Sequence, residues 1–190
     1  MELKEAIVKR RTKRKFIDKK VPHDKLVEII EYARYAPMGA NLQGIKYILI
    51  EDEKLVKNIF GYTKWSGYHP ENAPNENEQP TSYVAMLGDL TIKENGNFET
   101  DAGAAGTIIC LVANDLGLEC CWLGAINKEK ISELLNIDKR YKLLYLIAVG
   151  YSLQESKTVN ATGDIRYFTD ESDVLTVPKR TTDELIIKNY

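Results

Sequence analysis

One segment near the middle of the chain restricts the fold more than any other. Residues 101–116 are apolar almost all round a helical wheel, and the run Gly-Ala-Ala-Gly at 103–106 lies near its start. A helix without a polar face must be covered on several sides, by its own sheet or by a second subunit. The uncharged part, residues 102–114, is about thirteen residues long, shorter than the roughly 20 that a membrane span needs. We therefore expect a buried helix and no membrane partner.

The segments on either side of this helix alternate between helical and strand patterns. Asp24 and Asn127 are the expected N-caps of two further helices, and Pro37 is expected to end the first of them. The other expected elements are helices over 2–10 and 53–60 and strands over 45–50, 83–87, 119–123 and 143–151. Interleaved helices and strands indicate an α/β or α+β fold with a central sheet.

Two long segments lack a regular pattern. Residues 61–82 are polar and contain three prolines, and a structureless run of this length is often a binding lid. Residues 152–178 are expected to be irregular as well, and a short apolar strand at 185–187 follows them. That strand could pack on its own chain or pair with a neighbour's sheet, and the sequence leaves both open. We expect a single domain, 1–190, with a lid-like loop at 61–82 and a C-terminal extension at 152–190.

Composition argues against several classes of protein. With 26 Lys and Arg against 28 Asp and Glu, the net charge is −2, which argues against nucleic-acid binding over the whole surface. Three cysteines, two of them adjacent, predict buried reduced thiols of a cytoplasmic protein instead of a disulfide framework. The charged N-terminus lacks the apolar run of a signal peptide. Two early histidines give neither zinc-ligand spacing nor a Ser-His-Asp arrangement, so we expect no metal site and no hydrolase chemistry.

The strongest candidate for chemistry is the basic segment, residues 9–15, in which six of the seven residues are cations. Three interpretations are open: a solvated helix end whose cations suit the helix dipole, a patch that binds nucleic acid, and a cradle for a phosphate group. Guanidinium groups bind phosphate oxygens through paired hydrogen bonds, and Thr12 adds a hydroxyl donor. Composition alone does not separate the three.

Three shorter motifs accompany the basic segment. In residues 36–43 (APMGANLQ), Asn41 and Gln43 offer amide groups that suit the polar edge of a ring. At the end of the third expected strand, Gly124 lets a backbone N–H come close to a flat ligand. Residues 177–180 (VPKR) add two cations. Each motif alone also fits an ordinary turn or a solvated loop, and the GxGxxG dinucleotide fingerprint is absent.

Together, these motifs resemble those of the nitroreductase family of flavoenzymes, in the same order and over almost the whole chain. The resemblance rests on five short boxes, none of which is specific alone. The matching residues are Arg10, Arg11, Thr12, Arg14 and Phe16 in the first box, Ala36, Pro37, Asn41 and Gln43 in the second, Asp101 to Ala105 in the third, Gly117, Leu118, Trp122 and Gly124 in the fourth, and Val177 to Arg180 in the fifth. Met38 and Gly39 stand where the family has serine-type residues, and Gly44 stands where proline is usual, which is expected to loosen that turn.

The resemblance implies an α+β fold with a central, mostly antiparallel sheet flanked by helices, built as an intertwined homodimer. Two FMN molecules would bind at the interface, and the C-terminal strand would add to the partner's sheet. The implied activity is an FMN-dependent oxidoreductase that uses NAD(P)H to reduce nitroaromatics, quinones or similar conjugated acceptors by a ping-pong hydride mechanism. The alternatives are a flavin-dependent relative that dehalogenates or fragments flavin, and a non-catalytic module that binds through a basic arm.

The resemblance also implies roles for individual residues. Arg10, Lys179 and Arg180 would hold the FMN phosphate, Arg11 and Thr12 would contact the phosphate and ribityl chain, and Arg14 would lie near N1 and the C2 carbonyl of the ring. Pro37, Met38, Gly39, Asn41 and Gln43 would approach the flavin from the other subunit, and Leu123 and Gly124 would lie at its N5 edge. No catalytic side chain is implied, because the flavin carries the chemistry. Residues 62–68 match no box, and we expect them to line the substrate slot, although Trp65 equally suits a core anchor.

Overall fold

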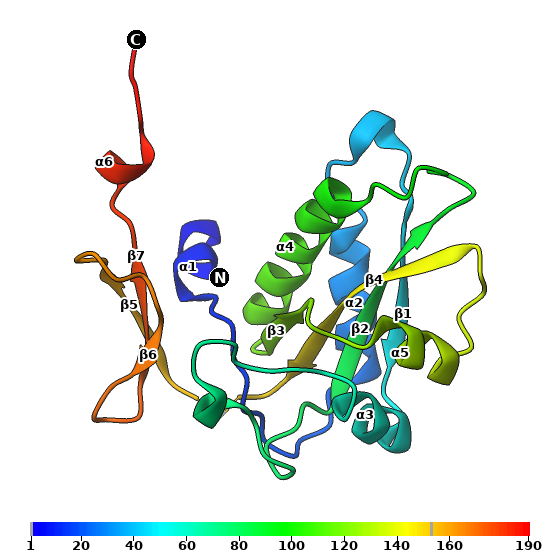
Figure 1. The fold of residues 1–190 in the computed structure, drawn as a ribbon, viewed down its shortest axis with the longest axis horizontal. Helices are drawn as coiled ribbons and strands as arrows, with labels where there is room; N and C mark the ends of the chain where they lie inside the picture. The colour runs from blue at the N-terminus through cyan, green and yellow to red at the C-terminus, as the bar shows by residue number, and fades with distance from the viewer. Residues whose placement is uncertain (1, 153) are drawn as a thin grey trace.

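The computed structural model describes residues 2–152 and 154–190, and its core is a four-stranded sheet (Figure 1). The strands are β1 (Ile45–Ile50), β2 (Ser82–Asp89), β3 (Glu119–Leu123) and β4 (Tyr141–Gly150). They lie in the order β1-β2-β4-β3, and every neighbouring pair is antiparallel. The helices are α1 (Leu3–Lys9), α2 (His23–Ala33), α3 (Glu53–Phe60), α4 (Glu99–Asp115), α5 (Lys128–Leu134) and α6 (Thr182–Leu185). The expected α+β fold with a central antiparallel sheet is confirmed.

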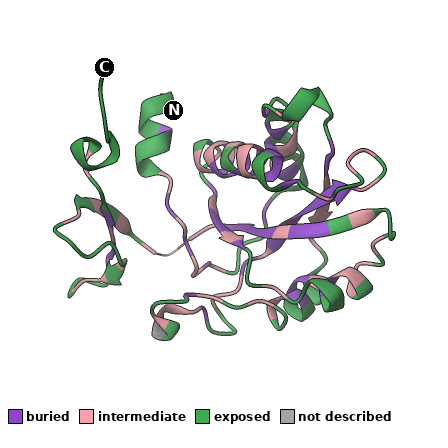
Figure 2. Cartoon of the chain, turned by 45° about the horizontal axis from the view of Figure 1, so that its top comes forward, coloured by how far each residue is buried: buried purple, intermediate pink, exposed green. Residues whose placement is uncertain are grey.

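The main sheet is buried on both faces, because its strands alternate between two cores. Val84 and Met86 of β2 face the first core, which α2 and α4 cover, whereas Tyr83 and Ala85 face the second core, which α3 and α5 cover. Successive side chains of a strand point to opposite faces, so a strand buried along its whole length needs a helical layer on each side. Figure 2 shows the buried residues concentrated in this sheet.

Helix α4 is the expected apolar helix, and it packs on the first core beside α2. Its inward residues, such as Ala102, Ala105 and Ile109, are fully buried. Its other apolar residues are only partly buried: Gly103, Ala104, Ile108, Leu111 and Val112. One chain therefore leaves part of the apolar surface of α4 open to solvent.

The turn before β1 is fixed by Phe98, the residue that precedes α4. Phe98 is fully buried, and a Cβ at Gly88 of β2 would lie 2.3 Å from its ring. A Cβ at Gly44 would lie 3.1 Å from the same ring, and the Gly44 carbonyl accepts a hydrogen bond from the Asp89 backbone N–H (2.9 Å). The Phe98 ring and this hydrogen bond restrain the turn at Gly44, and its expected loosening stays a prediction.

The start of α2 also differs from the expectation. Pro22 is the N-cap and His23 opens the helix, so Asp24 lies in the first turn and caps nothing. Its carboxylate still suits the positive end of the helix dipole. The expected cap of α5 is confirmed, since the Asn127 side chain accepts a hydrogen bond from the Lys130 backbone N–H (3.1 Å).

The C-terminal extension is more regular than expected. It forms β5 (Ser156–Asn160), β6 (Phe168–Thr169) and β7 (Leu175–Lys179), a small sheet in the order β5-β7-β6. The expected strand at 185–187 is wrong, because Leu185 ends α6 and Ile187 is 97% exposed. A capping box between Thr181 and Glu184 closes the first turn of α6 and favours helix there.

Other parts of the chain agree with the sequence. The three cysteines are buried and unbridged, as expected. Within residues 61–82, regular structure is confined to the short 3₁₀ turn η2 (Pro70–Asn72) and the start of β2. Among the helices in the described ranges, none has both the length and the apolar character to cross a membrane.

The close packing around Phe98 gives a stability test. In Gly88→Ala the new methyl group overlaps the Phe98 ring, so the ring or β2 must shift. We expect the free energy of unfolding to fall by about 1–3 kcal/mol, the usual cost of overpacking. Urea denaturation followed by circular dichroism measures the change.

The matched control is Gly67→Ala, because nothing lies within 4 Å of a Cβ at that exposed position. This substitution should change the free energy of unfolding by less than about 0.5 kcal/mol. If Gly88→Ala were as stable as wild type, Phe98 would not pack on β2 as described.

Candidate functional site

The basic segment is built into the edge of the main sheet. The Lys13 backbone N–H donates to the Cys120 carbonyl of β3 (3.0 Å), and Thr12 pairs with Cys120 in a parallel bridge. Phe16 follows the segment and is fully buried in the second core. The segment is thus tied down by β3 and by Phe16, and its side chains are held beside β3.

Two cations of this segment are buried. Arg11 is 8% exposed and Lys13 is 4% exposed, so a solvated helix end is the wrong interpretation for both. Burial disfavours the charged form and lowers the pKa of each side chain below its ordinary value. The Lys13 ammonium donates to the Gln154 carbonyl, and a terminal nitrogen of Arg11 donates to the Arg10 carbonyl. Arg11 Nε is buried and has no hydrogen-bond partner within the described residues.

Glu119, at the start of β3, interacts with these buried cations. Burial raises the pKa of its carboxyl group, and the charges of Lys13 and Arg10 act in the opposite direction. Its Oε2 atom lacks a hydrogen-bond partner in the part of the chain that the structure describes. Glu155 also acts on Lys13, but the two carboxylates do not balance the charges of Arg10, Arg11 and Lys13, so this region keeps an excess of positive charge.

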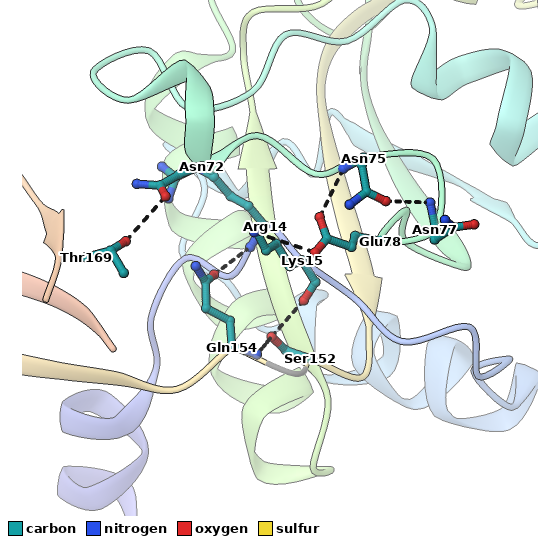
Figure 3. A network of polar contacts seen from close by, with 9 residues as sticks. All are labelled: Arg14, Lys15, Asn72, Asn75, Asn77, Glu78, Ser152, Gln154 and Thr169. Atoms are coloured by element: carbon teal, nitrogen blue, oxygen red, sulfur yellow. Dashed lines mark hydrogen bonds and ion pairs between the residues drawn. The ribbon is translucent and has the colours of Figure 1, made fainter. Parts of the chain in front are cut away.

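The other end of the basic segment is joined to two distant parts of the chain (Figure 3). The Arg14 backbone N–H donates to Gln154 Oε1 (3.3 Å), and the Ser152 hydroxyl donates to the Lys15 carbonyl (2.9 Å). The Lys15 ammonium lies 3.5 Å from the Glu78 carboxylate. The backbone at Arg14 and Lys15 is therefore fixed, and the Arg14 side chain is placed by contacts of its own.

The loop of residues 36–43 lies at the start of α4. Its 3₁₀ turn η1 (Gly39–Asn41) brings the Gly39 N–H to 3.0 Å from Asp101 Oδ1, in the first turn of α4. The buried Asp101 carboxylate also accepts a hydrogen bond from the Lys93 ammonium (2.6 Å). Burial acts to raise the pKa of Asp101, but these two hydrogen bonds outweigh it, and the pKa lies below its ordinary value of 3.8.

The rest of this loop is exposed and partly strained. Ala40, Asn41 and Gln43 have φ angles of 50°, 54° and 53°, in the left-handed region. Pro37, Asn41 and Gln43 are exposed, whereas Met38 is partly buried against the first core. Strained backbone of this kind clusters at ligand sites and switch regions, so the loop is a candidate contact surface.

The end of β3 borders a hollow in the surface. Leu123 is buried in the second core, and Gly124 directly after it is exposed. Residues 61–64 and 124–127 line a hollow of about 510 Å³. Trp65 packs partly buried against the second core and is therefore a core anchor.

Lys179 and Arg180 lie at the end of β7 and are exposed. Lys179 is opposite Asn160 in the register with β5, and Arg180 pairs with Glu184 (3.5 Å). The small sheet and α1 lie on the same side of the molecule in both ribbon views (Figures 1 and 2). Within the described residues, no hydrogen bond or ion pair links these cations to Arg10, so their convergence on one ligand stays a prediction.

Helix α4 separates the two halves of the expected site within one chain. The 36–43 loop meets α4 at Asp101, whereas the basic segment pairs with Cys120 of β3, whose side chain is hydrogen-bonded to Cys110 of α4. With a rise of about 1.5 Å per residue, the length of helix between Asp101 and Cys110 is about 14 Å. The two halves therefore contact α4 at separate places within a single chain.

Two contributors to the site geometry were not found from the sequence. Lys13 had no assigned role, and its burial depends on Gln154, which is 141 positions away. Tyr167 lies in the extension that was expected to be irregular, and its ring lies 4.6 Å from the Arg14 guanidinium. Neither contact has a local sequence signal, because each joins segments that only the fold brings together.

Comparison with known proteins identifies relatives over most of the chain. The sequence model of the nitroreductase family matches residues 7–89 and 78–151. A Methanothermobacter thermautotrophicus protein named "Putative NADH dehydrogenase/NAD(P)H nitroreductase" is 25% identical over 162 residues, which are 83% of this chain and 81% of that protein. The crystal structure of a nitroreductase family protein from Clostridium novyi NT is 28% identical, with a TM-score of 0.68 over 80% of this chain and 86% of that one. An FMN-dependent nitroreductase from Clostridium difficile R20291 is 26% identical, with a TM-score of 0.67 over 83% and 91%.

The contacts of Asp101 give a stability test with a pH signature. In Asp101→Asn the amide loses the charge-assisted bonds to Lys93 and Gly39, and we expect the free energy of unfolding at pH 7 to fall by about 1.5–3 kcal/mol. Because the folded-state pKa of Asp101 is lowered, its contribution is full above the unfolded-state pKa of about 3.9 and is lost as the pH falls through the lower folded-state pKa. Urea denaturation at a series of pH values should show the two proteins converging below about pH 4.

The exposed pair of Glu133 and Lys130 (3.0 Å) is the control for this test. Glu133→Gln should change the free energy of unfolding by no more than about 0.5 kcal/mol at any pH. A difference between wild type and Asp101→Asn that stays constant down to pH 2 would contradict the role given to the ionised carboxylate.

Proposed function

The chain belongs to the nitroreductase family, and from this premise we propose that it is an FMN-dependent enzyme that uses NAD(P)H to reduce nitroaromatics, quinones or similar conjugated acceptors. The names of two relatives support these cofactors, since one is called FMN-dependent and the other an NAD(P)H nitroreductase. The observation that carries the proposal is the buried positive charge of the basic segment. A phosphate group has the charge and the acceptor oxygens to neutralise it.

The donors of the basic segment fit the FMN phosphate. Arg11 Nε is a buried donor that no described residue satisfies, and such a donor destabilises the protein until a ligand pairs with it. Arg10 adds a second, partly buried guanidinium, and Thr12 adds a hydroxyl. Arginine pairs with phosphate through two parallel N–H donors. We propose that Lys179 and Arg180 complete the phosphate site.

We propose further that two copies of the chain form a homodimer that shares each FMN site. The basic segment and the 36–43 loop contact α4 at separate places in one chain, about 14 Å apart along the helix, and in the proposal the loop of a second copy lies beside the flavin that the basic segment holds. The partly buried apolar residues of α4 offer a surface for this contact. A partner would also cover the exposed apolar residues at the C-terminus, Leu185, Ile186, Ile187 and Tyr190.

FMN, when bound, supplies the hydride chemistry, and the residues of the chain set its environment. In the proposal, Arg14 lies beside N1 and the C2 carbonyl, where its positive charge favours the negative charge that reduction adds. The backbone N–H at Gly124 donates at the N5 edge, where a side chain would hinder close approach. Leu123 holds this position, because its side chain is anchored in the second core.

The hollow beside Gly124 is the proposed place where the nicotinamide and the acceptor bind in turn. It is lined by residues 61–64 and 124–127, which supports for residues 62–64 the expectation that residues 62–68 line the substrate slot. An open slot suits ping-pong kinetics, because the first product must leave before the acceptor binds.

The alternative functions differ in how they use the basic segment. A flexible basic arm for nucleic acid is not favoured, because Arg11 and Lys13 are buried and cannot reach a large external partner. A flavin enzyme that dehalogenates or fragments flavin keeps the same cofactor site. Turnover assays with halogenated aromatics and with reduced flavin separate it from a nitroreductase.

The absorbance spectrum of the purified protein tests the proposed function. We expect the visible bands of oxidised flavin, and anaerobic addition of NADH or NADPH should bleach them because the bound FMN is reduced. A colourless protein that takes up no added FMN would contradict the proposal.

The phosphate site is tested by comparing FMN with riboflavin, which lacks the phosphate. Arg10→Ala and Arg180→Ala should each weaken FMN binding to the apoprotein by about ten- to a hundredfold, the value of one charge-assisted contact, and should leave riboflavin binding unchanged. Fluorescence titration measures both affinities. Lys139→Ala, at an exposed position before β4, is the control and should change neither. If these two substitutions weakened the binding of FMN and of riboflavin equally, the FMN phosphate would not be bound by Arg10 and Arg180.

A further inference from the structure

Tyr167, in the connection between β5 and β6, contacts four residues from distant parts of the chain. The Arg14 guanidinium lies over its ring, 4.6 Å from the ring centroid. The rings of Tyr68 and His69 lie beside it, with centroid distances of 5.5 and 5.8 Å. The Ser66 hydroxyl is 3.2 Å from the Tyr167 hydroxyl. Tyr167 lies beyond the residues that match the family model, and the proposed function gives it no role.

The Arg14 side chain depends on this ring for its position. Within the described residues, no hydrogen bond or ion pair holds its guanidinium, whereas its backbone N–H is fixed by Gln154 (3.3 Å). A guanidinium that stacks on an aromatic face keeps its in-plane N–H donors free. Tyr167 therefore sets the plane of the Arg14 guanidinium without occupying its donors.

Tyr167 is itself restrained by the 61–82 segment. Ser66 is buried and has a φ of 50°, a left-handed conformation that residues with side chains seldom adopt. Strain of this kind persists only where surrounding contacts fix the backbone, and here the fixed serine presents its hydroxyl to Tyr167. The rings of Tyr68 and His69 restrain Tyr167 further. Arg14 therefore stacks on a ring that has little freedom to move.

We propose that Tyr167 is a positioning residue for Arg14 and, through Arg14, for the pyrimidine edge of bound FMN. This inference rests on the proposed function, in which Arg14 lies beside N1 and the C2 carbonyl. Stacking orients the N–H donors of Arg14 before FMN binds, so the Arg14 side chain loses less conformational freedom when FMN binds. Because reduction adds negative charge at that edge, an oriented Arg14 stabilises reduced FMN more than oxidised FMN.

Two substitutions separate the ring of Tyr167 from its hydroxyl. Tyr167→Leu removes the ring and keeps an apolar side chain, whereas Tyr167→Phe keeps the ring. For the full-length protein we measure the Kd of FMN by fluorescence titration and the midpoint potential of bound FMN. Tyr167→Leu should weaken FMN binding by about three- to thirtyfold, the range of a cation–π contact. Tyr167→Phe should stay within about twofold of wild type, because the ring face is retained.

The midpoint potential separates positioning from a merely structural role. If Tyr167→Leu loses tenfold more affinity for reduced than for oxidised FMN, the potential of this two-electron couple falls by about 30 mV. A structural role alone weakens both redox forms equally and leaves the potential unchanged. The proposal is overturned if Tyr167→Leu leaves the affinity for FMN or the midpoint potential unchanged. It is also overturned if Tyr167→Phe loses as much affinity for FMN as Tyr167→Leu does.

Tyr141→Leu is the matched control, because Arg140 lies over the Tyr141 ring at 4.5 Å, outside the proposed site. It should change neither the Kd of FMN nor the midpoint potential.

If Tyr167→Leu does not fold, Tyr167→Met takes its place with the same expected result, since the flexible methionine side chain fills the space without a ring. Failure of the proposed function is distinct, because wild-type protein would then bind no FMN at all.

Discussion

Burial of positive charge along the edge of β3 is the constraint on which the rest of the structure depends. Moving a cation out of water costs several kcal/mol unless new partners replace its hydration. Lys13 finds part of that compensation in the Gln154 carbonyl and the charge of Glu119, whereas Arg11 keeps a buried donor without a partner in the described chain. Phe16, which has no exposed surface, prevents the segment from moving into solvent. The fold therefore creates a fixed place where an anion is stabilising.

The architecture of the main sheet explains why the candidate site has separate parts. Helices cover both faces of the sheet, so groups that bind a ligand must come from edges, strand ends and loops. The basic segment uses the edge of β3, and Gly124 follows the end of the same strand. The 36–43 loop is held by Asp101 at the start of α4, about 14 Å along the helix from Cys110, which contacts Cys120 beside the basic segment. The homodimer that we propose would bring these parts together and would cover the apolar surface that one chain leaves open on α4.

The sequence predicted those parts of the molecule that have strong local signals. The bounds of β1, α3 and β3 are the expected ones, because short apolar runs and an amphipathic turn mark them clearly. The strands β5 and β7 were missed, because both are short, β5 is mostly exposed, and they pair in parallel across a long connection. In the site, the run of cations at 9–15 is visible in the sequence, but the contact of buried Lys13 with Gln154 and the stacking of Arg14 on Tyr167 depend on the C-terminal extension.

A crystal structure of the protein with bound FMN tests the central claim most directly, because it locates the anion that the buried cations require. We expect a phosphate oxygen within about 3 Å of Arg11 Nε, the distance of a normal N–H···O hydrogen bond, in a site lined by two copies of the chain. A phosphate bound elsewhere, with Arg11 Nε still buried and unpaired, would contradict the claim.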